Sequence, residues 1–379
     1  MTLSHDLLLA GLVAVLGVAS LTVPGQDRVL ATDPLDGNGR AAWRRAPSAF
    51  VEAPGGRRAF QCVRGATIDP SALPWIGDAS WSSYRVEVDV LPEKNWAGID
   101  FHVQDDERAG CEVTLIHVPT RQIVFEIAGI WDGAYGWKLW PVGQRKIHHE
   151  DRRWVHVRLD VGATTANLYI DGSQEPAASF HDLPFGRGGV RLATYAGSAL
   201  FRNLRIVEIS ERDARARLED PWAAARKGHV LTDWVVTPPR EKDYSADRLP
   251  PEVLSDTGPW VRAAVDPRGV VNLSALFRGR NTAGVTFART TLTATKAGPR
   301  RVTLTYTDNY SLWCNGEKVF TGPPRQWFHP EREKHGNSRL IPDQYEVTLP
   351  LRAGANQVVV RSEVTEPFGW AFWMRLVDE

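Results

Sequence analysis

Hydrophobic and polar residues alternate with a period of two over much of this 379-residue chain. In the clearest run, residues 84–90, tyrosine and three valines alternate with arginine, glutamate and aspartate. Successive side chains of a β-strand point to opposite faces, so this run predicts a strand with one buried and one polar face. Similar runs fill residues 60–209 and resume after residue 270. Many short strands separated by turn residues are typical of antiparallel sandwiches, so we predict an all-β protein.

Two of the apolar runs end in a tight-turn signal. The first ends at Asp171-Gly172 and the second at Asn315-Gly316, each inside its own stretch of strand pattern. Both central residues of a type I′ turn need a positive φ, which Gly adopts at no steric cost and Asn or Asp tolerates. The two signals therefore predict two β-sandwiches in series.

The character of the chain changes between these stretches. Residues 211–219 are rich in helix formers, and Ser210 precedes Asp213 by the spacing of a helix cap. We expect two β-sandwich (jelly-roll) domains, at residues 33–209 and 228–379, joined by a short helical linker at 210–227.

The chain begins with an almost unbroken apolar run over residues 7–23 that carries no charge. A membrane-spanning helix needs about 20 residues, so this run is short for that role and fits a secretory signal better. We predict a cleaved signal peptide at residues 1–23, with an uncleaved N-terminal anchor as the alternative. Either outcome places the protein outside the cell, at the cell surface or in the periplasm.

The charges balance, with 45 Lys and Arg against 45 Asp and Glu. Nothing in that balance suggests nucleic acid or an anionic membrane as partner, and a neutral ligand fits better than a polyanion. The three cysteines have no metal-ligand spacing. Either Cys62 and Cys111 form a disulfide, or all three cysteines, including Cys314, are buried thiols. No dinucleotide or P-loop fingerprint is present.

Six strand and turn segments follow one another in the first stretch. They are 81–90 (WSSYRVEVDV), 96–101 (WAGIDF), 154–159 (WVHVRL), 168–172 (LYIDG), 188–194 (GGVRLAT) and 201–204 (FRNL). In this order they resemble the concanavalin A-like and laminin G-like jelly rolls, and within them the branch associated with 3-keto-disaccharide hydrolases. The resemblance implies a jelly-roll fold and a secreted, bacterial-type protein, but no particular activity, because lectins, glycosidases and adhesion modules share this fold.

Four segments of the second stretch also form a recognisable series. They are 233–236 (DWVV), 308–319 (DNYSLWCNGEKV), 351–360 (LRAGANQVVV) and 369–376 (GWAFWMRL). They resemble a galactose-binding-type sandwich of the sort appended to secreted carbohydrate enzymes. Such domains often bind glycans, and some only support a neighbouring domain. Asn309 departs from the second aspartate that usually precedes the turn, which puts a calcium or sugar contact there in doubt.

Polar residues on the predicted strands supply the candidate chemistry. Glu87 and Asp89 resemble part of the three-carboxylate strand of family sixteen glycoside hydrolases, but the third carboxylate, Glu93, comes one residue late. Asp89, Asp100 and His102 would share one polar face if residues 87–90 paired with 99–103 across a turn at 92–97. A carboxylate beside an imidazole can act as acid and base or hold a divalent ion. The alternative is an exposed polar face without function.

Aromatic residues form a second candidate. Residues 131–140 carry Trp131, Trp137 and Trp140 with a tyrosine and two glycines, and Trp96 lies earlier on a predicted strand. Sugars stack on such rings while polar side chains bond their hydroxyls. The alternative is that the rings fill the core, as most of the fifteen tryptophans must.

These observations favour a protein that binds a glycan or oligosaccharide, either without a cofactor or with calcium. The expected ligand-binding residues are Glu87, Asp89, Trp96, Asp100, His102, Trp131, Trp137 and Trp140. The first alternative is a glycoside hydrolase or a 3-keto-disaccharide hydrolase-like enzyme that uses the acidic residues and His102 as acid and base. The second is a structural or assembly protein without a ligand, which would bury aromatic residues between its two domains and expose no pocket. A protein partner stays open on each of these interpretations.

Overall fold

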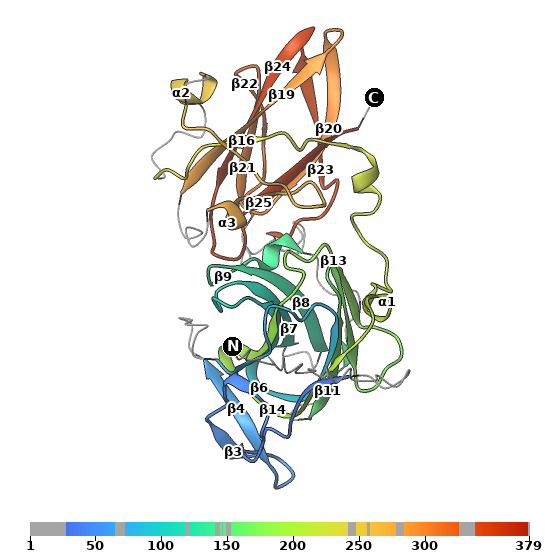
Figure 1. Ribbon diagram of the computed structural model, residues 1–379. Helices are drawn as coiled ribbons and strands as arrows, with labels where there is room; N and C mark the ends of the chain where they lie inside the picture. The colour runs from blue at the N-terminus through green and yellow to red at the C-terminus, as the bar shows by residue number, and fades with distance from the viewer. Residues whose placement is uncertain are drawn as a thin grey trace, which may run out of the picture.

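Strands dominate the structure, a computed structural model, and each helix is about one turn long (Figure 1). The predicted all-β class is confirmed. No helix among the residues described is long and apolar enough to cross a membrane. The apolar run at residues 7–23 lies outside them. The structure describes residues 28–64, 73–118, 122–140, 145, 147–148, 153–241, 248–255, 258–277, 284–325 and 338–377.

The first fourteen strands belong to one sheet that folds around a core. Its central path runs β10-β8-β7-β6-β11-β12-β13, and β14 pairs with β6 and with the short strands near the N-terminus. The strands are β1 (Val29–Asp33), β2 (Trp43–Arg45), β3 (Phe50–Glu52), β4 (Arg58–Arg64), β5 (Trp75–Ile76), β6 (Tyr84–Val103), β7 (Gly110–Val118), β8 (Gln122–Trp131), β9 (Ala134–Tyr135), β10 (Ile147–His148), β11 (Val155–Val161), β12 (Thr165–Ile170), β13 (Ala178–His181) and β14 (Gly189–Glu208).

Strand β6 is a single strand of 20 residues, so the predicted hairpin between residues 87–90 and 99–103 is wrong. On one edge, its first half pairs with β11 and its second half with β7. Pro92 lies between these two pairings, where no partner on that edge needs a backbone N–H. The chain therefore continues through the proline instead of turning, and Asp89 lies far along the strand from Asp100 and His102.

The period-two pattern correctly identifies the core face of β6. Val86, Val88 and Val90 are fully buried in the main hydrophobic cluster together with Ile99 and Phe101. At about 25 cal/mol per Å² of apolar surface removed from water, such residues supply most of the driving force for folding.

The later part of the chain forms two further sheets. One has five strands in the order β15-β25-β20-β23, with β18 beside β25, and the other has six in the order β17-β16-β19-β24-β21-β22. The strands are β15 (His229–Val230), β16 (Val235–Val236), β17 (Val261–Arg262), β18 (Val271–Asn272), β19 (Val285–Ala294), β20 (Gly298–Tyr306), β21 (Asn309–Cys314), β22 (Glu317–Thr321), β23 (Tyr345–Leu351), β24 (Gly354–Glu363) and β25 (Ala371–Leu376).

The predicted hairpin at Asn315-Gly316 is confirmed. Both residues have positive φ, at 52° and 83°, and Cys314 pairs directly with Glu317. At Asp171-Gly172 the φ values are also positive, at 51° and 74°, but β12 and β13 start to pair only at Leu168 and Ala178. The Asp171-Gly172 signal therefore predicts the turn and not the length of the connection.

The connection between the two parts contains less helix than expected. Helix α1 (Glu211–Ala214) is capped as predicted, because the Ser210 side chain accepts a hydrogen bond from the Asp213 N–H. The other short helices are η2 (Trp137–Leu139), η3 (Ala225–Lys227), α2 (Pro251–Leu254) and α3 (Leu273–Leu276). The domain boundaries at 209 and 228 remain a prediction.

All three cysteines are buried, and no disulfide joins any two of them. The prediction that Cys62 and Cys111 are buried thiols is therefore confirmed, and the alternative of a disulfide between them is wrong. Burial raises the pKa of the Cys111 thiol, which keeps it protonated.

Candidate functional site

The predicted carboxylates Glu87 and Asp89 lie on the outer face of β6 and are paired with basic residues. Glu87 accepts a hydrogen bond from Arg205 at 2.8 Å. Asp89 contacts His156 at 2.9 Å, Arg202 at 3.1 Å and Asn203 at 2.8 Å. Burial opposes ionisation of Asp89, but these three bonds outweigh it and hold its pKa below the usual value.

Asp100 lies on the same polar side of β6 but is completely buried. It accepts a hydrogen bond at 2.6 Å from Arg191 of β14, whose guanidinium is equally buried. Arg191 also donates to the carbonyl of Glu107 at 2.8 Å. These contacts make Asp100 part of an internal ion pair between two long strands, with no exposure to a ligand in this arrangement.

His102 is also buried, and it has a φ of 50° that few residues other than glycine adopt. Its Nδ1 lies 2.6 Å from the Phe185 carbonyl and its Nε2 lies 3.3 Å from the Ser82 carbonyl. Burial lowers the pKa of His102 to about 4 and outweighs the two carbonyls, which favour the charged ring. His102 is therefore neutral at pH 7, with the proton on Nδ1.

This low pKa predicts a loss of stability in acid. As the pH falls, the unfolded chain takes up the histidine proton near pH 6.5, whereas the folded chain takes it up only near pH 4. We expect the free energy of unfolding to fall by about 3 kcal/mol over this window because of His102. Urea unfolding of the wild type and of His102→Asn at several pH values measures this pH dependence. Asparagine is chosen because it tolerates the left-handed backbone conformation. If the free energy of unfolding depends on pH equally in both proteins, the low pKa of His102 is contradicted.

The predicted aromatic residues lie at the junction between the first sheet and the later part of the chain (Figure 1). Trp131, Trp137 and Trp140 are only 7%, 3% and 3% exposed. Trp131 stacks on Trp140 with ring centres 6.0 Å apart, and Trp96, which is partly exposed, meets Trp137 at 5.7 Å. Ligand contact by the three buried rings remains a prediction.

Residues from the later part cover these rings. Phe368 lies 5.7 Å from the Trp137 ring, and the Arg268 guanidinium lies 4.7 Å above Trp140. Arg339 donates hydrogen bonds to the carbonyls of Trp137 and Trp140, at 2.6 and 3.0 Å, and pairs with Glu126 of β8. The aromatic segment therefore acts as packing between the two parts, as the structural alternative expects.

A polar pocket that the sequence did not single out lies beside the start of β6. We call it the Trp81 pocket. Its volume is about 330 Å³, near the lower end of the range for small-molecule sites. It is lined by Arg28, Leu30, Asp78, Ser80, Trp81, Ser82, Ser83, Glu208 and Ile209.

The ring of Trp81 is partly exposed in this pocket and held in place from behind. Gly77 has a φ of 97°, and a Cβ atom there would come within 2.7 Å of the ring. Tyr84 packs against the ring edge-on at 5.9 Å. Only glycine at position 77 allows this approach, so the ring is fixed before any ligand arrives.

Asp78 provides a charged acceptor in the same pocket. Its Oδ1 accepts hydrogen bonds from the backbone N–H of Ser80 at 2.7 Å and from the Ser80 hydroxyl at 2.5 Å. These two bonds lower the pKa of Asp78, so the carboxylate is ionised at neutral pH. The sequence signal for this arrangement is an Asp-x-Ser turn directly before a tryptophan and the first long strand.

Among the described residues, no three His, Cys, Asp or Glu side chains gather as metal ligands would. Of the residues predicted from sequence, Trp140 lines a small pocket together with Trp222 and Arg268. Asp89 approaches a further pocket through its bonds to Arg202 and Asn203. The sequence also places Trp327, Phe328, His329 and His335 in a long charged loop, where they would either contact a ligand or pack between domains. These four residues lie outside the residues described.

No protein-family model matches the chain, and no curated protein matches it. Solved structures similar to part of it are carbohydrate-binding modules, family 43 glycoside hydrolases and galectin-like folds. Carbohydrate binding module CBM66 from Bacillus subtilis is 15% identical with a TM-score of 0.33, covering 44% of this chain and 95% of that chain.

Two further structures show the range. Xylan beta-1,4-xylosidase from Bacillus halodurans C-125 is 17% identical with a TM-score of 0.35, covering 50% of this chain and 41% of that enzyme. Sheep galectin-11 is 12% identical with a TM-score of 0.25, covering 38% of this chain and 98% of that chain. This chain thus spans less than half of the xylosidase. At such low TM-scores we base no functional conclusion on these likenesses.

Proposed function

We propose that this protein is a secreted or cell-surface glycan-binding protein that holds a neutral sugar in the Trp81 pocket. The observation that carries the proposal is the fixed, partly exposed ring of Trp81 beside the ionised carboxylate of Asp78. The C–H face of a pyranose packs on an aromatic face, while carboxylates and hydroxyls bond its hydroxyl groups. Ser80 and Ser83 supply hydroxyls at the same pocket.

Binding fits the ionisation of the acidic residues better than hydrolysis does. A glycosidase needs a general acid whose pKa is raised, so that it carries a proton at neutral pH. The pKa values of Asp78 and Asp89 are both lowered by hydrogen bonds. Asp100 is buried against Arg191. None of these three carboxyl groups therefore fits the general acid that a 3-keto-disaccharide hydrolase-like enzyme would need.

The decisive variant is Trp81→Ala in the mature chain. We expect its affinity for the best-bound neutral oligosaccharide to fall at least tenfold, equivalent to about 1.4 kcal/mol, because the stacking surface is lost. The ligand is first found on a glycan array, and affinities are then measured by isothermal titration calorimetry.

Trp260→Ala is the matched control, since Trp260 is also partly exposed but lies in the later part of the chain, beside Arg289 at 4.5 Å. Its affinity should equal that of the wild type. A neutral glycan that binds Trp81→Ala as tightly as the wild type would reject the Trp81 pocket, and an array without any bound glycan would reject the function.

A further inference from the structure

A second pocket is lined by residues at the start of β4 and on β14. Figure 1 shows β4 at the end of the molecule away from the later sheets. We call this second pocket the arginine pocket. Its volume is about 380 Å³, which is larger than a single inorganic ion requires and within the range of small-ligand sites. It is lined by Pro34, Asp36, Asn38, Arg57, Arg58, Arg202 and Asn203.

The residues that line this pocket carry a net positive charge, although the whole chain is neutral and Arg202 is paired with Asp89. Three arginines face one aspartate, Asp36, whose Oδ1 accepts the backbone N–H of Asn38 at 2.8 Å. Guanidinium groups bind carboxylate and sulfate oxygens through paired N–H donors. A local excess of positive charge in a concave site therefore favours an anionic ligand.

Arg57 and Arg58 are both exposed and neither forms an ion pair among the residues described. They follow the tight turn at Gly55 and Gly56, whose φ values are 96° and 73°. Arg58 lies 5.7 Å over the ring of Phe50, which restrains the arginine without neutralising it. Both guanidinium groups thus keep their charge for a ligand.

Arg202 and Asn203 are held from behind by Asp89. The carboxylate accepts Arg202 Nε at 3.1 Å and Asn203 Nδ2 at 2.8 Å, and the Arg202 guanidinium rests 4.0 Å over the Trp154 ring. The bond to Asp89 uses Nε, so the terminal nitrogens of Arg202 remain for the pocket. Asp89, predicted from sequence as a ligand contact, acts here as a positioning residue.

We propose that the arginine pocket binds an acidic sugar through an oxyanion, either a carboxylate or a sulfate group. The oxyanion contacts Arg57, Arg58 and Arg202. The amides of Asn38 and Asn203 and the carboxylate of Asp36 bond the sugar hydroxyls. This inference does not depend on the Trp81 pocket, because the two pockets share no lining residue.

The test is isothermal titration calorimetry of the mature chain with glucuronate, glucose 6-sulfate, glucose and inorganic sulfate at low and high salt. We expect one or both acidic sugars to bind more tightly than glucose and inorganic sulfate, and binding to weaken at high salt because ions screen the arginines. Glucuronate binding alone identifies a carboxylate site, and glucose 6-sulfate binding alone identifies a sulfate site.

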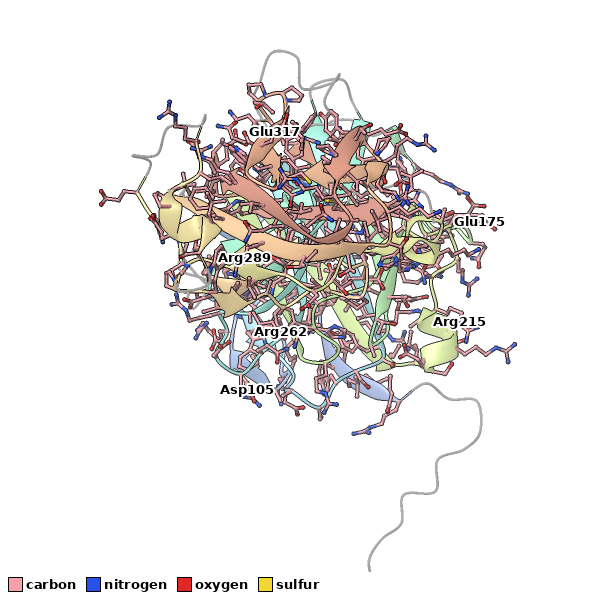
Figure 2. The ribbon with its side chains drawn as sticks, turned by 90° about the horizontal axis from the view of Figure 1, so that it is seen from above. Asp105, Glu175, Arg215, Arg262, Arg289 and Glu317 are labelled. Carbon is pink, nitrogen blue, oxygen red and sulfur yellow. The ribbon has the colours of Figure 1, made fainter. Side chains whose placement is uncertain are left out.

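The double variant Arg57→Gln/Arg58→Gln should weaken that binding at least tenfold. Arg212→Gln/Arg215→Gln removes the same charge from helix α1, at the surface where Figure 2 labels Arg215, and should change nothing. Trp81→Ala should also leave the affinity for acidic sugars unchanged. The experiment therefore tests the arginine pocket separately from the Trp81 pocket. Three results would overturn the proposal. They are glucose binding as tightly as glucuronate and glucose 6-sulfate, inorganic sulfate binding as tightly as the acidic sugars, and an equal loss of affinity in both double variants.

Discussion

Replacing Lys138 with alanine is expected to lower the free energy of unfolding by about 3–5 kcal/mol. Lys138 and Asp308 are both completely buried at the junction of the two parts, with Nζ and Oδ1 2.9 Å apart. The variant leaves the Asp308 carboxylate without its counter-charge in a place that water does not reach. Removing one partner of such a pair is far more costly than replacing both.

Asp308 is tied into the later part by other bonds, which prevents it from moving out to solvent. Its Oδ1 accepts the Thr365 N–H at 2.9 Å and the Thr365 hydroxyl at 2.8 Å, and its Oδ2 accepts the Thr307 hydroxyl at 2.5 Å. The double variant Lys138→Met/Asp308→Asn should therefore recover part of the lost stability, because both charges of the buried pair are removed together. Glu366, 3.8 Å from the Lys138 Nζ, still loses Lys138 as a counter-charge in this variant.

Urea unfolding followed by fluorescence measures both changes. Arg262→Ala is the control, since Arg262 and Asp233 form an ion pair whose side chains are 82% and 86% exposed, and Figure 2 labels Arg262. We expect no measurable effect there, because water screens exposed pairs. A loss in Lys138→Ala no larger than in Arg262→Ala would show that the junction does not depend on this pair.

Arg191→Ala is expected to cost a similar amount, about 3–5 kcal/mol, within the first sheet. It removes the only cation bonded to the buried Asp100 among the described residues, and it also removes the donor to the Glu107 carbonyl. The change leaves a cavity as well as an unpaired carboxylate. We expect a lower midpoint in urea unfolding, with an unchanged dependence on urea concentration if the fold is retained.

The same two strands carry a matched exposed pair. Arg205 of β14 and Glu87 of β6 are 2.8 Å apart with side chains 45% and 24% exposed, so Arg205→Ala should cost less than about 1 kcal/mol. Equal losses in Arg191→Ala and Arg205→Ala would contradict the view that burial sets the cost. Arg191→Met/Asp100→Asn should be more stable than Arg191→Ala.

Neighbouring residues decide the strands and turns of this chain, and the sequence therefore predicts them well. Val86, Val88 and Val90 face the core because side chains alternate along a strand, and Asn315-Gly316 closes a two-residue hairpin because both residues accept positive φ. The local pattern did not reveal that Pro92 lies inside one long strand. That depends on which partners flank β6 on each side of the proline.

The alternation of apolar and polar residues and the turn residues predict the all-β class, the core face of the strands and the chemistry available at each position. They do not predict which polar and aromatic side chains become buried. Alternation identifies the side of β6 on which Asp100 and His102 lie, but it cannot show that residues distant in the chain cover that side and bury both. Trp137 lies in η2, and residues of the later part of the chain cover it. Equally, the arginine pocket combines β4 with β14, which are more than a hundred residues apart in the chain, and only pairing of the strands brings them together.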